Sequence, residues 1–404
     1  MPNPEVVTNY KDSDGVDLGK KLISKDYLIS VYPQIADQLI TPELWTWGRN
    51  NVGQLGTNDD TNRDTPVTTL AGGSNWKQVS TGYSHCAAIK TDGTLWVWGF
   101  NFYAQLGTND TVNRSTPVTT FAGGTNWKQV GGGSYHNAAI KTDGTLWVWG
   151  FNPHGGLGDN TTNTKSTPVT TFAGGTNWKQ VSAGYSHCAA IKTDGTLWTW
   201  GRNTFSTLGT NDLTARCTPV TTFAGGSNWK QVECGWLTIG AIKTDGTLWT
   251  WGRNYFGKLG TNDDTDRNTP VTTFAGGSNW KSLDVGYFGI AAIKTDGTLW
   301  TWSHNLYGQL GINDTTNRYT PVTTFAGGTN WKQVDTGDYH NAAIKTDGTL
   351  WTWGRNTYGQ LGVNGGIQRL TPVTTSAGGT NWKQVSGGNV QTAAIKTSDD
   401  LIGI

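Results

Sequence analysis

The sequence predicts an all-β fold, a closed seven-bladed β-propeller of four-stranded blades preceded by a short N-terminal segment. The pair Trp-x-Trp begins at seven positions spaced by 51 residues, namely Trp45, Trp96, Trp147, Trp198, Trp249, Trp300 and Trp351. Each period also holds four short strand-like segments and no segment of helical periodicity. Four strands in a period of roughly 40 to 50 residues are typical of a propeller blade.

One repeat unit illustrates the predicted strands, which cover residues 116–121, 126–130, 138–141 and 145–150. Asp143-Gly144 separates the last two, and an Asp-Gly pair between β-forming segments indicates a tight hairpin. Alternation along the last strand puts Trp147 and Trp149 on one face. We expect these indoles, and the third repeated tryptophan at Trp127, to pack as core between blades rather than to stack on a ligand.

Counting blades from each Thr-Pro-Val segment leaves the strand around Trp45 unassigned at the N-terminal end. The last period ends in Leu401 to Ile404, which follow Leu350 by 51 residues but lack both indoles. We therefore predict that the Trp45 strand joins the C-terminal blade and closes the ring, because closure removes exposed sheet edges. The sequence leaves the role of Leu401 to Ile404 open.

Composition excludes several classes of function. The 30 Lys and Arg residues against 29 Asp and Glu give a net charge of +1, so no global field attracts nucleic acid, and we expect no nucleic-acid partner. No apolar run reaches the roughly 20 residues of a membrane span, and the N-terminus lacks a signal-peptide pattern, so we expect synthesis in the cytoplasm and no membrane insertion. The four cysteines are spaced poorly for a disulfide or a metal site, and we interpret them as core or loop residues.

Two longer words recur in recognisable form in all seven units of residues 44–404, namely Gly48-Arg49-Asn50-Asn51-Val52-Gly53-Gln54-Leu55-Gly56 and Gly82-Tyr83-Ser84-His85-Cys86-Ala87-Ala88-Ile89. This pattern resembles the repeat of the regulator of chromosome condensation family. Some units depart from it, with Lys258 in place of the glutamine and Thr238, Gly289 and Gln391 in place of the histidine. The resemblance implies a seven-bladed propeller that binds proteins. Family members act as exchange factors, enzyme inhibitors and scaffolds, so the particular function does not follow from the fold.

Residues 1–43 differ from the blades. This stretch resembles short N-terminal modules of tailed-bacteriophage structural proteins, which implies an attachment or oligomerisation segment that binds other virion proteins. The alternative is a strand and short helix that cap one face of the propeller. The predicted division is therefore an N-terminal segment over 1–43 and a propeller over 44–404.

Residues that could carry chemistry follow the repeat. Four of the six histidines, His85, His136, His187 and His340, share one repeat position, which is typical of a framework residue. Asn58-Asp59-Asp60 and its copies lack the bidentate Glu of a calcium loop. Glu233, Asp284 and Asp335 occupy one position in successive units and are the only candidates for a carboxylate pair such as glycoside hydrolysis needs. We predict no enzyme activity, no catalytic residue, no metal and no cofactor.

Two loops differ strongly between units that are otherwise nearly identical, and both are rich in aromatic residues. Unconstrained drift favours small polar residues in loops, whereas Tyr, Trp and Phe provide contact area at low entropic cost. The alternative is that these rings only fill space between blades. The predicted binding residues are Tyr83, Tyr135, Tyr185, Trp236, Tyr287, Phe288 and Tyr339 in the first loop, and Tyr103, Phe205, Phe256, Tyr307 and Tyr358 in the second.

These observations lead to two functional hypotheses. The first is a non-enzymatic phage virion protein, a tail fibre or receptor-binding component, that presents the propeller loops to a host-surface protein or glycan. The second is an intracellular bacterial scaffold or protein inhibitor that acts in the cytoplasm. A homotrimer formed through residues 1–43 would favour the first, and a monomer would favour the second.

Overall fold

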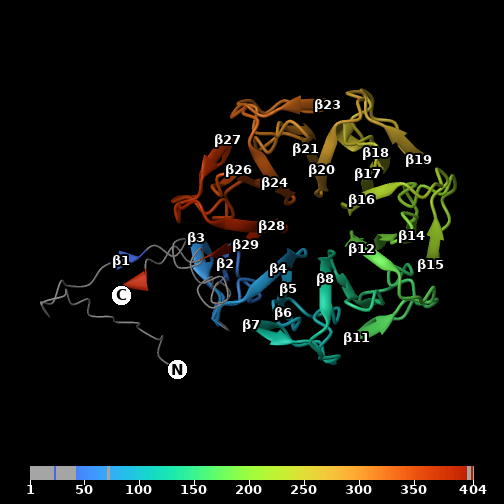
Figure 1. Cartoon of the computed structure of the whole chain (residues 1–404), viewed down its shortest axis with the longest axis horizontal. Helices are drawn as coiled ribbons and strands as arrows, with labels where there is room; N and C mark the ends of the chain where they lie inside the picture. Colours follow the sequence, from blue (N-terminus) through green and yellow to red (C-terminus); the bar gives the residue numbers. More distant parts are fainter. Residues whose placement is uncertain (1–21, 24–41, 71–72, 398–401, 404) are drawn as a thin grey trace, which may run out of the picture.

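A computed structural model describes residues 22–23, 42–70, 73–397 and 402–403 of the chain. In these residues the strands form seven four-stranded antiparallel sheets and one two-stranded pair. Figure 1 shows the seven sheets arranged as blades around a central channel, with one strand of each blade nearest the channel. The predicted seven-bladed β-propeller is confirmed.

The two strands nearest the channel come from the Asn-Trp-Lys and Ala-Ala-Ile-Lys words of each repeat. The innermost strands are β4 (Trp76–Thr81), β8 (Trp127–Gly132), β12 (Trp178–Ala183), β16 (Trp229–Cys234), β20 (Trp280–Val285), β24 (Trp331–Thr336) and β28 (Trp382–Gly387). The second strands are β5 (His85–Lys90), β9 (His136–Lys141), β13 (His187–Lys192), β17 (Thr238–Lys243), β21 (Gly289–Lys294), β25 (His340–Lys345) and β29 (Gln391–Thr397).

The two outer strands come from the Trp-x-Trp and Thr-Pro-Val words. The third strands are β6 (Leu95–Gly99), β10 (Leu146–Gly150), β14 (Leu197–Gly201), β18 (Leu248–Gly252), β22 (Leu299–Ser303), β26 (Leu350–Gly354) and β2 (Pro42–Gly48). The outermost strands are β7 (Arg114–Thr119), β11 (Lys165–Thr170), β15 (Arg216–Thr221), β19 (Arg267–Thr272), β23 (Arg318–Thr323), β27 (Arg369–Thr374) and β3 (Arg63–Thr68).

The blade boundaries differ from those counted in the sequence. Each Thr-Pro-Val strand pairs with the Trp-x-Trp strand before it, as Val118 pairs with Val97, and so ends a blade instead of beginning one. The peripheral place suits proline, which cannot donate a ladder hydrogen bond and is confined to strand edges. A blade therefore runs from Trp-Lys-Gln-Val to the next Thr-Pro-Val.

The ring closes through the N-terminal part of the chain, as predicted. β2 pairs with β29 over seven positions, from Pro42 opposite Thr397 to Gly48 opposite Gln391. The closing blade takes β3 as well, so two N-terminal strands complete it. Figure 1 shows these blue strands beside the red strands β28 and β29. Of the terminal residues left open by the sequence, Ile402–Gly403 (β30) pair antiparallel with Leu22–Ile23 (β1).

The hydrophobic core consists of seven clusters, each lying between two adjacent blades. In one of them Trp149 packs against Ala87, Ile89 and Leu95 of the preceding blade. Its indole N–H donates to the Gln105 carbonyl at 2.8 Å, so the buried ring leaves no donor unpaired. Trp127 lies edge-on to both Trp147 and Trp149 at centroid distances of 6.0 and 6.3 Å. The tryptophans are core residues, as predicted.

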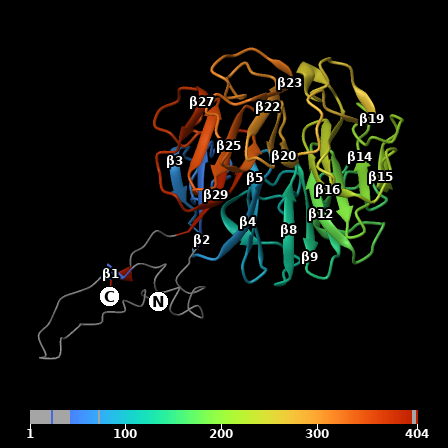
Figure 2. The ribbon, with the colours of Figure 1, turned by 45° about the horizontal axis from the view of Figure 1, so that its top comes forward.

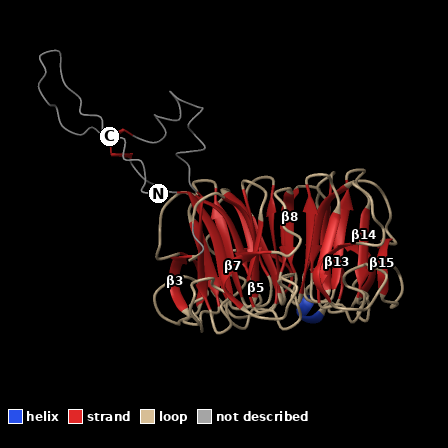
Figure 3. Ribbon diagram, turned by 90° about the horizontal axis from the view of Figure 1, so that it is seen from below, coloured by secondary structure: helices blue, strands red, loops and turns tan. Residues whose placement is uncertain are grey.

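The strands run between two faces of a disc, as the side view in Figure 3 shows. Loops that join first to second strands and third to fourth strands lie on one face, because successive antiparallel strands reverse direction. We call it the aromatic face. The 3₁₀ turn η2 (Tyr255–Gly257) lies on this face, at the lower edge of the disc in Figure 3. Pro42 and Thr397 lie at the opposite face, so the chain enters and leaves the ring away from the aromatic loops.

Candidate interaction face and central channel

The twelve predicted binding residues all lie on the aromatic face, and many of them touch one another. The first-loop rings form a chain around the channel mouth. Centroid distances are 5.7 Å for Tyr83–Tyr135, 5.9 Å for Tyr135–Tyr185, 6.4 Å for Tyr185–Trp236, 4.3 Å for Trp236–Tyr287 and 4.6 Å for Phe288–Tyr339. The Trp236 and Tyr287 planes differ by 13°, which makes this pair a parallel stack.

The second-loop rings extend this layer outward. Tyr103 lies 5.0 Å from Tyr135, and Tyr307 lies 5.2 Å from Tyr339. Phe256 lies 4.5 Å from His304, with the two rings tilted by 37°. Tyr83 is 36% exposed and the other predicted rings are half-buried, so each of them keeps part of its surface accessible to solvent. This geometry therefore agrees both with rings that bind a partner and with rings that fill space between blades.

Four arginines lie among these rings at one repeat position, directly after the third strand. The guanidinium carbon of Arg253 lies 4.6 Å from the centroid of Phe205 and 5.3 Å from that of Trp236. Arg355 lies over Tyr307 and Tyr339, Arg49 over Tyr358, and Arg202 over Phe205. Cation–π attraction of this kind holds each guanidinium close to a ring.

The remaining blades replace these arginines by other side chains. His304 takes the place between Arg253 and Arg355, so Arg202, Arg253, His304, Arg355 and Arg49 occupy five consecutive blades. We call the four arginines the arginine arc. The other two blades carry Phe100 and Phe151 at this position.

Aromatic side chains of the two blades that carry Phe100 and Phe151 form an apolar cluster. Its members are Phe100, Phe102, Tyr103, Tyr135 and Phe151. Phe100 stacks on Phe102 at 6.3 Å, and Tyr103 lies 4.6 Å from Phe151. Phe102 is 67% exposed. The aromatic face is therefore divided into a cationic arc and an apolar sector.

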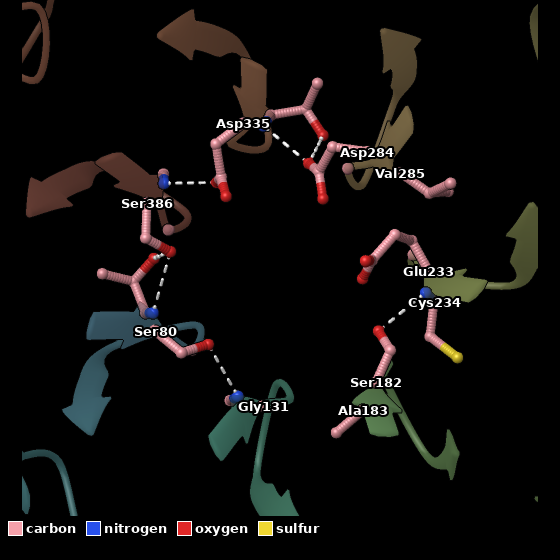
Figure 4. A pocket seen from close by; sticks show the side chains of 18 of the residues that line it. Ser80, Gly131, Ser182, Ala183, Glu233, Cys234, Asp284, Val285, Asp335 and Ser386 are labelled. Carbon is pink, nitrogen blue, oxygen red and sulfur yellow. Dashed lines mark hydrogen bonds between the residues drawn. The ribbon is translucent and has the colours of Figure 1, made fainter. Parts of the chain in front are cut away.

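The channel has a volume of about 360 Å³ and extends from the glutamines of the innermost strands to Tyr83, Trp236 and Tyr287 at the aromatic face. At mid-depth, one repeat position projects inward from every blade. It holds Ser80, Gly131, Ser182, Glu233, Asp284, Asp335 and Ser386. Figure 4 shows Glu233, Asp284 and Asp335 pointing into the channel from successive strands.

Most side chains at this position link one blade to the next. Ser182 accepts a hydrogen bond from the Cys234 N–H at 2.9 Å, and Asp335 accepts one from the Gly387 N–H at 2.6 Å. Asp284 accepts from both the main chain and the hydroxyl of Thr336. Glu233 has no such main-chain partner in the next blade. It accepts from the side-chain amide of Gln180 in the preceding blade at 3.1 Å and from that of Gln231 in its own strand at 3.2 Å.

Crowding of acids in a narrow channel perturbs their protonation. Removal from bulk water, and secondarily the charge of Asp284, raises the pKa of Glu233 to about 8. Burial also raises the pKa of Asp284 and that of Asp335. Nearer the aromatic face, burial raises the pKa of Asp338 to about 7, although the ammonium of Lys258 opposes the shift. All three candidate carboxylates thus accept a hydrogen bond from an adjacent blade, Asp284 and Asp335 from the main chain and Glu233 from the side chain of Gln180.

The repeated histidines are buried framework residues, as predicted, and most of them bridge blades. The Nε2 atoms of His85, His136 and His340 lie 3.1 Å from Asn137 Oδ1, 3.1 Å from Cys188 Sγ and 2.8 Å from Thr392 Oγ1. In the described part of the chain, His187 has no hydrogen-bond partner on either ring nitrogen, because Ile239 stands where the next blade would supply one. Burial lowers the pKa of His85 and of His136 to about 4, so both rings are neutral at pH 7.

The other candidate groups have structural surroundings. Asp59 binds Arg63 at 2.5 Å and accepts from Asn50, so its carboxylate is used within its own loop. Cys86, Cys188 and Cys234 are buried free thiols, and Cys217 is half-buried. The described residues contain no group of three or more His, Cys, Asp or Glu side chains arranged to hold a metal. In the same part of the chain, no helix has the length and apolarity to span a bilayer.

Sequence reasoning missed the arginines. They lie in the Gly-Arg-Asn words that carry the family resemblance, and they were not among the predicted binding residues. The available signal was that Arg49, Phe100, Phe151, Arg202, Arg253, His304 and Arg355 share one position yet differ in charge and ring character.

A rigid repeat propeller with a continuous layer of aromatic and arginine side chains on one face defines the class of interaction propellers. Comparison with known families then identifies the family. The description "RCC1-like domain" matches residues 166–404, and "Regulator of chromosome condensation (RCC1) repeat" matches residues 43–89 and 92–140. The chain belongs to the RCC1 repeat family.

Individual relatives span diverse proteins. The chain is 30% identical over 363 residues to the ultraviolet-B receptor UVR8 of Arabidopsis thaliana, with 87% of this chain and 82% of the relative covered. It is 28% identical to part of the human E3 ubiquitin-protein ligase HERC2, over 88% of this chain but only 8% of that protein. It is also 26% identical to the mitochondrial RCC1 domain-containing protein RUG3 of A. thaliana, with 84% of each covered.

Solved structures support the fold. Human WBSCR16 superposes with a TM-score of 0.78 at 19% identity, covering 88% of this chain and 100% of that chain. Prp20p of Saccharomyces cerevisiae, described together with its binding to Gsp1p and histones, gives 0.78 at 17% identity, with 90% and 93% covered.

The predicted phage-like character of residues 1–43 finds no support in these comparisons, whose family matches begin at residue 43. Apart from residues 22–23 and 42–43, that segment lies outside the described residues. The boundary at residue 43 and the attachment role therefore stay predictions.

Proposed function

We propose that this protein is a non-enzymatic protein-interaction module that binds its partner through the aromatic face. The observation that carries the proposal is the layer of neighbouring, partly exposed rings. They stand at loop positions where nearly identical repeats differ. Rigid aromatic side chains on loops of a fixed scaffold are typical binding anchors. Proteins similar to this one that bind protein partners, such as Prp20p with Gsp1p and histones, agree with this role.

The position of the chain ends favours the same face. Pro42 and Thr397 lie at the opposite face, so a segment joined there leaves the aromatic loops accessible to a partner. The carboxylates of the channel favour a non-catalytic role, because Asp284 and Asp335 hold neighbouring blades together.

The test is affinity capture from lysate of the source organism with quantitative mass spectrometry. The face variant is Tyr103→Ser with Tyr287→Ser, and the matched control is Phe121→Ser with Phe223→Ser. The control replaces two phenylalanines that are 65% and 66% exposed and follow the outermost strands, at the end away from the aromatic face. We expect a partner that the wild type and the control retain and the face variant loses. A partner retained equally by all three proteins would contradict the proposal.

The location of the protein is a finer question. A virion protein anchored by residues 1–43, whose partner would be a host-surface protein or glycan, and a cytoplasmic scaffold both use the same face. Light scattering on the full chain and on residues 44–404 separates them. A trimer that becomes a monomer on truncation would favour virion attachment, whereas monomers in both cases would favour the scaffold.

A further inference from the structure

We propose that the aromatic face recognises an acidic polypeptide segment, whose carboxylates bind the arginine arc and whose apolar side chain packs on the apolar cluster. This inference rests on the proposed function and specifies the chemistry of the partner.

The first observation is that the arginines of the arc lack anionic partners. Within the described residues, five other arginines form ion pairs with an aspartate four residues earlier, at 2.5 to 2.6 Å, namely Arg63, Arg114, Arg216, Arg267 and Arg318. No salt bridge involves Arg49, Arg202, Arg253 or Arg355 in that part of the chain. The same chain therefore pairs five of its six peripheral arginines and leaves the four of the arc without a salt bridge in the described residues. Arg369 is the exception, because Gly365 stands where those five units have the aspartate.

The second observation is the charge of the surroundings. The two sets of aromatic-face loop segments, residues 82–84 and 49–54 with their repeat equivalents, contain one acidic residue, Asp338. Lys258 is the cation whose charge acts on the Asp338 carboxyl. Its ammonium donates to the carbonyls of Gly286 and Tyr287 at 2.7 and 2.9 Å. The outer parts of the same loops, such as residues 55–62, carry further aspartates, of which Asp59 pairs with Arg63. No aspartate of the described residues forms a salt bridge with the four arginines of the arc.

The third observation is that the guanidinium groups are held in place. Ring centroids lie 4.6 to 5.9 Å from the four guanidinium carbons, and the Nε atoms of Arg202 and Arg355 donate to Thr204 and Thr357 at 3.0 and 2.9 Å. Their terminal N–H groups have no hydrogen-bond partner among the described residues. A guanidinium fixed by stacking loses little entropy when its N–H edge binds a carboxylate in bidentate fashion.

The fourth observation is that the apolar cluster completes the ring of seven blades. Phe102 is the most exposed ring of that cluster and stacks on Phe100. A partner that spans the channel mouth therefore meets four cations on one side and an apolar surface on the other. Acidic residues beside an aromatic or aliphatic anchor match this pattern.

Two other occupants fit less well. Single-stranded nucleic acid needs free ring faces for base stacking, but Trp236 is stacked on Tyr287, and Phe205 and Tyr358 lie under guanidinium groups. A second copy docked face to face would bring the arginine arc of one chain against a face that carries an arc of its own. A heterologous acidic polypeptide avoids both problems.

The experiment measures fluorescence anisotropy of a labelled peptide of Glu, Asp and Phe residues with the full chain. The face variant is Arg253→Gln with Arg355→Gln. The control is Lys128→Gln with Lys332→Gln, which removes the same charge from exposed side chains near the start of β8 and β24, at the opposite end of the channel. A peptide with Lys in place of the acids and a single-stranded oligonucleotide of equal charge serve as comparison probes.

We expect the acidic peptide to bind and the face variant to lose roughly tenfold or more in affinity, with the control unchanged. If the face variant unfolds at lower temperature, Arg253→Lys with Arg355→Lys keeps the charge, and we expect an intermediate loss. Equal binding by face variant and wild type, a loss confined to the lysine control, or equally tight binding of the oligonucleotide would overturn the inference. A captured protein that needs Tyr103 and Tyr287 but not the arginines would overturn it while leaving the proposed function intact.

Discussion

At the scale of single residues, the ionised side chain of Glu233 opposes folding, because its carboxylate is removed from bulk water. It shares the channel with Asp284 and Asp335 and, unlike them, gains no main-chain hydrogen bond from the next blade. Its pKa is raised to about 8, first by burial and then by the charge of Asp284. The unfolded chain releases this proton near pH 4.5, whereas the folded chain retains it up to about pH 8. Stability therefore falls as pH rises through this window, and the loss is complete above it.

Replacing Glu233 by Gln should remove this loss. We expect Glu233→Gln to have little effect on the free energy of unfolding near pH 4 and to stabilise the protein on the order of 2 kcal/mol above pH 8. Denaturant unfolding across pH 4 to 9 measures the difference. Glu43→Gln, the same change on a half-exposed residue of β2, is the matched control and should show no comparable trend. A difference that shrinks as pH rises would contradict the interpretation.

Residue-level patterns explain which parts of the site could be predicted. Ring positions such as Tyr287 stand out because large rings occupy a loop position that varies between units, and carboxylates such as Asp284 stand out because they replace serine or glycine. Variation also marks the position of Arg49, but the sequence does not show which arginines have an anionic partner. Only the fold reveals that Asp59 pairs with Arg63 while Arg49 lies over a ring of the preceding blade.

At the scale of elements, the innermost strands are joined by glutamines. The side-chain amide of Gln129 donates to the Val181 carbonyl at 3.2 Å and accepts from the Val181 N–H at 3.1 Å. Equivalent pairs of hydrogen bonds, one donated and one accepted by each glutamine, join six pairs of adjacent innermost strands in the described structure. The junction of β20 with β24 lacks them, because Ser282 replaces the glutamine and its hydroxyl has no hydrogen-bond partner among the residues that the structure describes.

Restoring the glutamine should strengthen this junction. We expect Ser282→Gln to stabilise the propeller by about 1 kcal/mol, because two neutral hydrogen bonds replace an unpaired hydroxyl at the cost of some side-chain entropy. Thermal unfolding measures the effect. Gln129→Ser, the reverse change at an intact junction, should destabilise by a similar or larger amount. A lower melting temperature for Ser282→Gln would contradict this expectation. It would show that the packing beside Leu283, which stands where the other innermost strands have valine, does not accept the longer side chain.

Strand identity was predictable from the sequence, but the grouping of strands into blades was not. The repeat fixes the order of the four words and not where a blade begins, since a circular permutation of the period gives the same pattern. Pairing of Val118 with Val97 decides the matter, and a proline in Thr-Pro-Val was the available clue to a peripheral strand.

At the scale of the whole molecule, stability depends on the contribution of the N-terminal strands to the last blade. β2 supplies Trp47 to the core between β24–β27 and the closing blade, and Leu44 to the core between the closing blade and β4–β7. Both side chains are fully buried. Without β2 and β3, the closing blade would keep two strands, two of the seven cores would lose members, and β29 would present an unpaired edge.

Two truncations separate ring closure from the N-terminal segment. We expect removal of residues 1–41 to leave the melting temperature of the propeller nearly unchanged, because β2 begins at Pro42. Removal of residues 1–70 deletes β2 and β3 and should cost several kcal/mol from Trp47 and Leu44 alone, at about 25 cal/mol per Å² of apolar surface. The open edge of β29 should also drive association between chains. Calorimetry and light scattering measure both effects. A 71–404 fragment as stable and monomeric as the 42–404 fragment would mean that six complete blades hold the ring without closure.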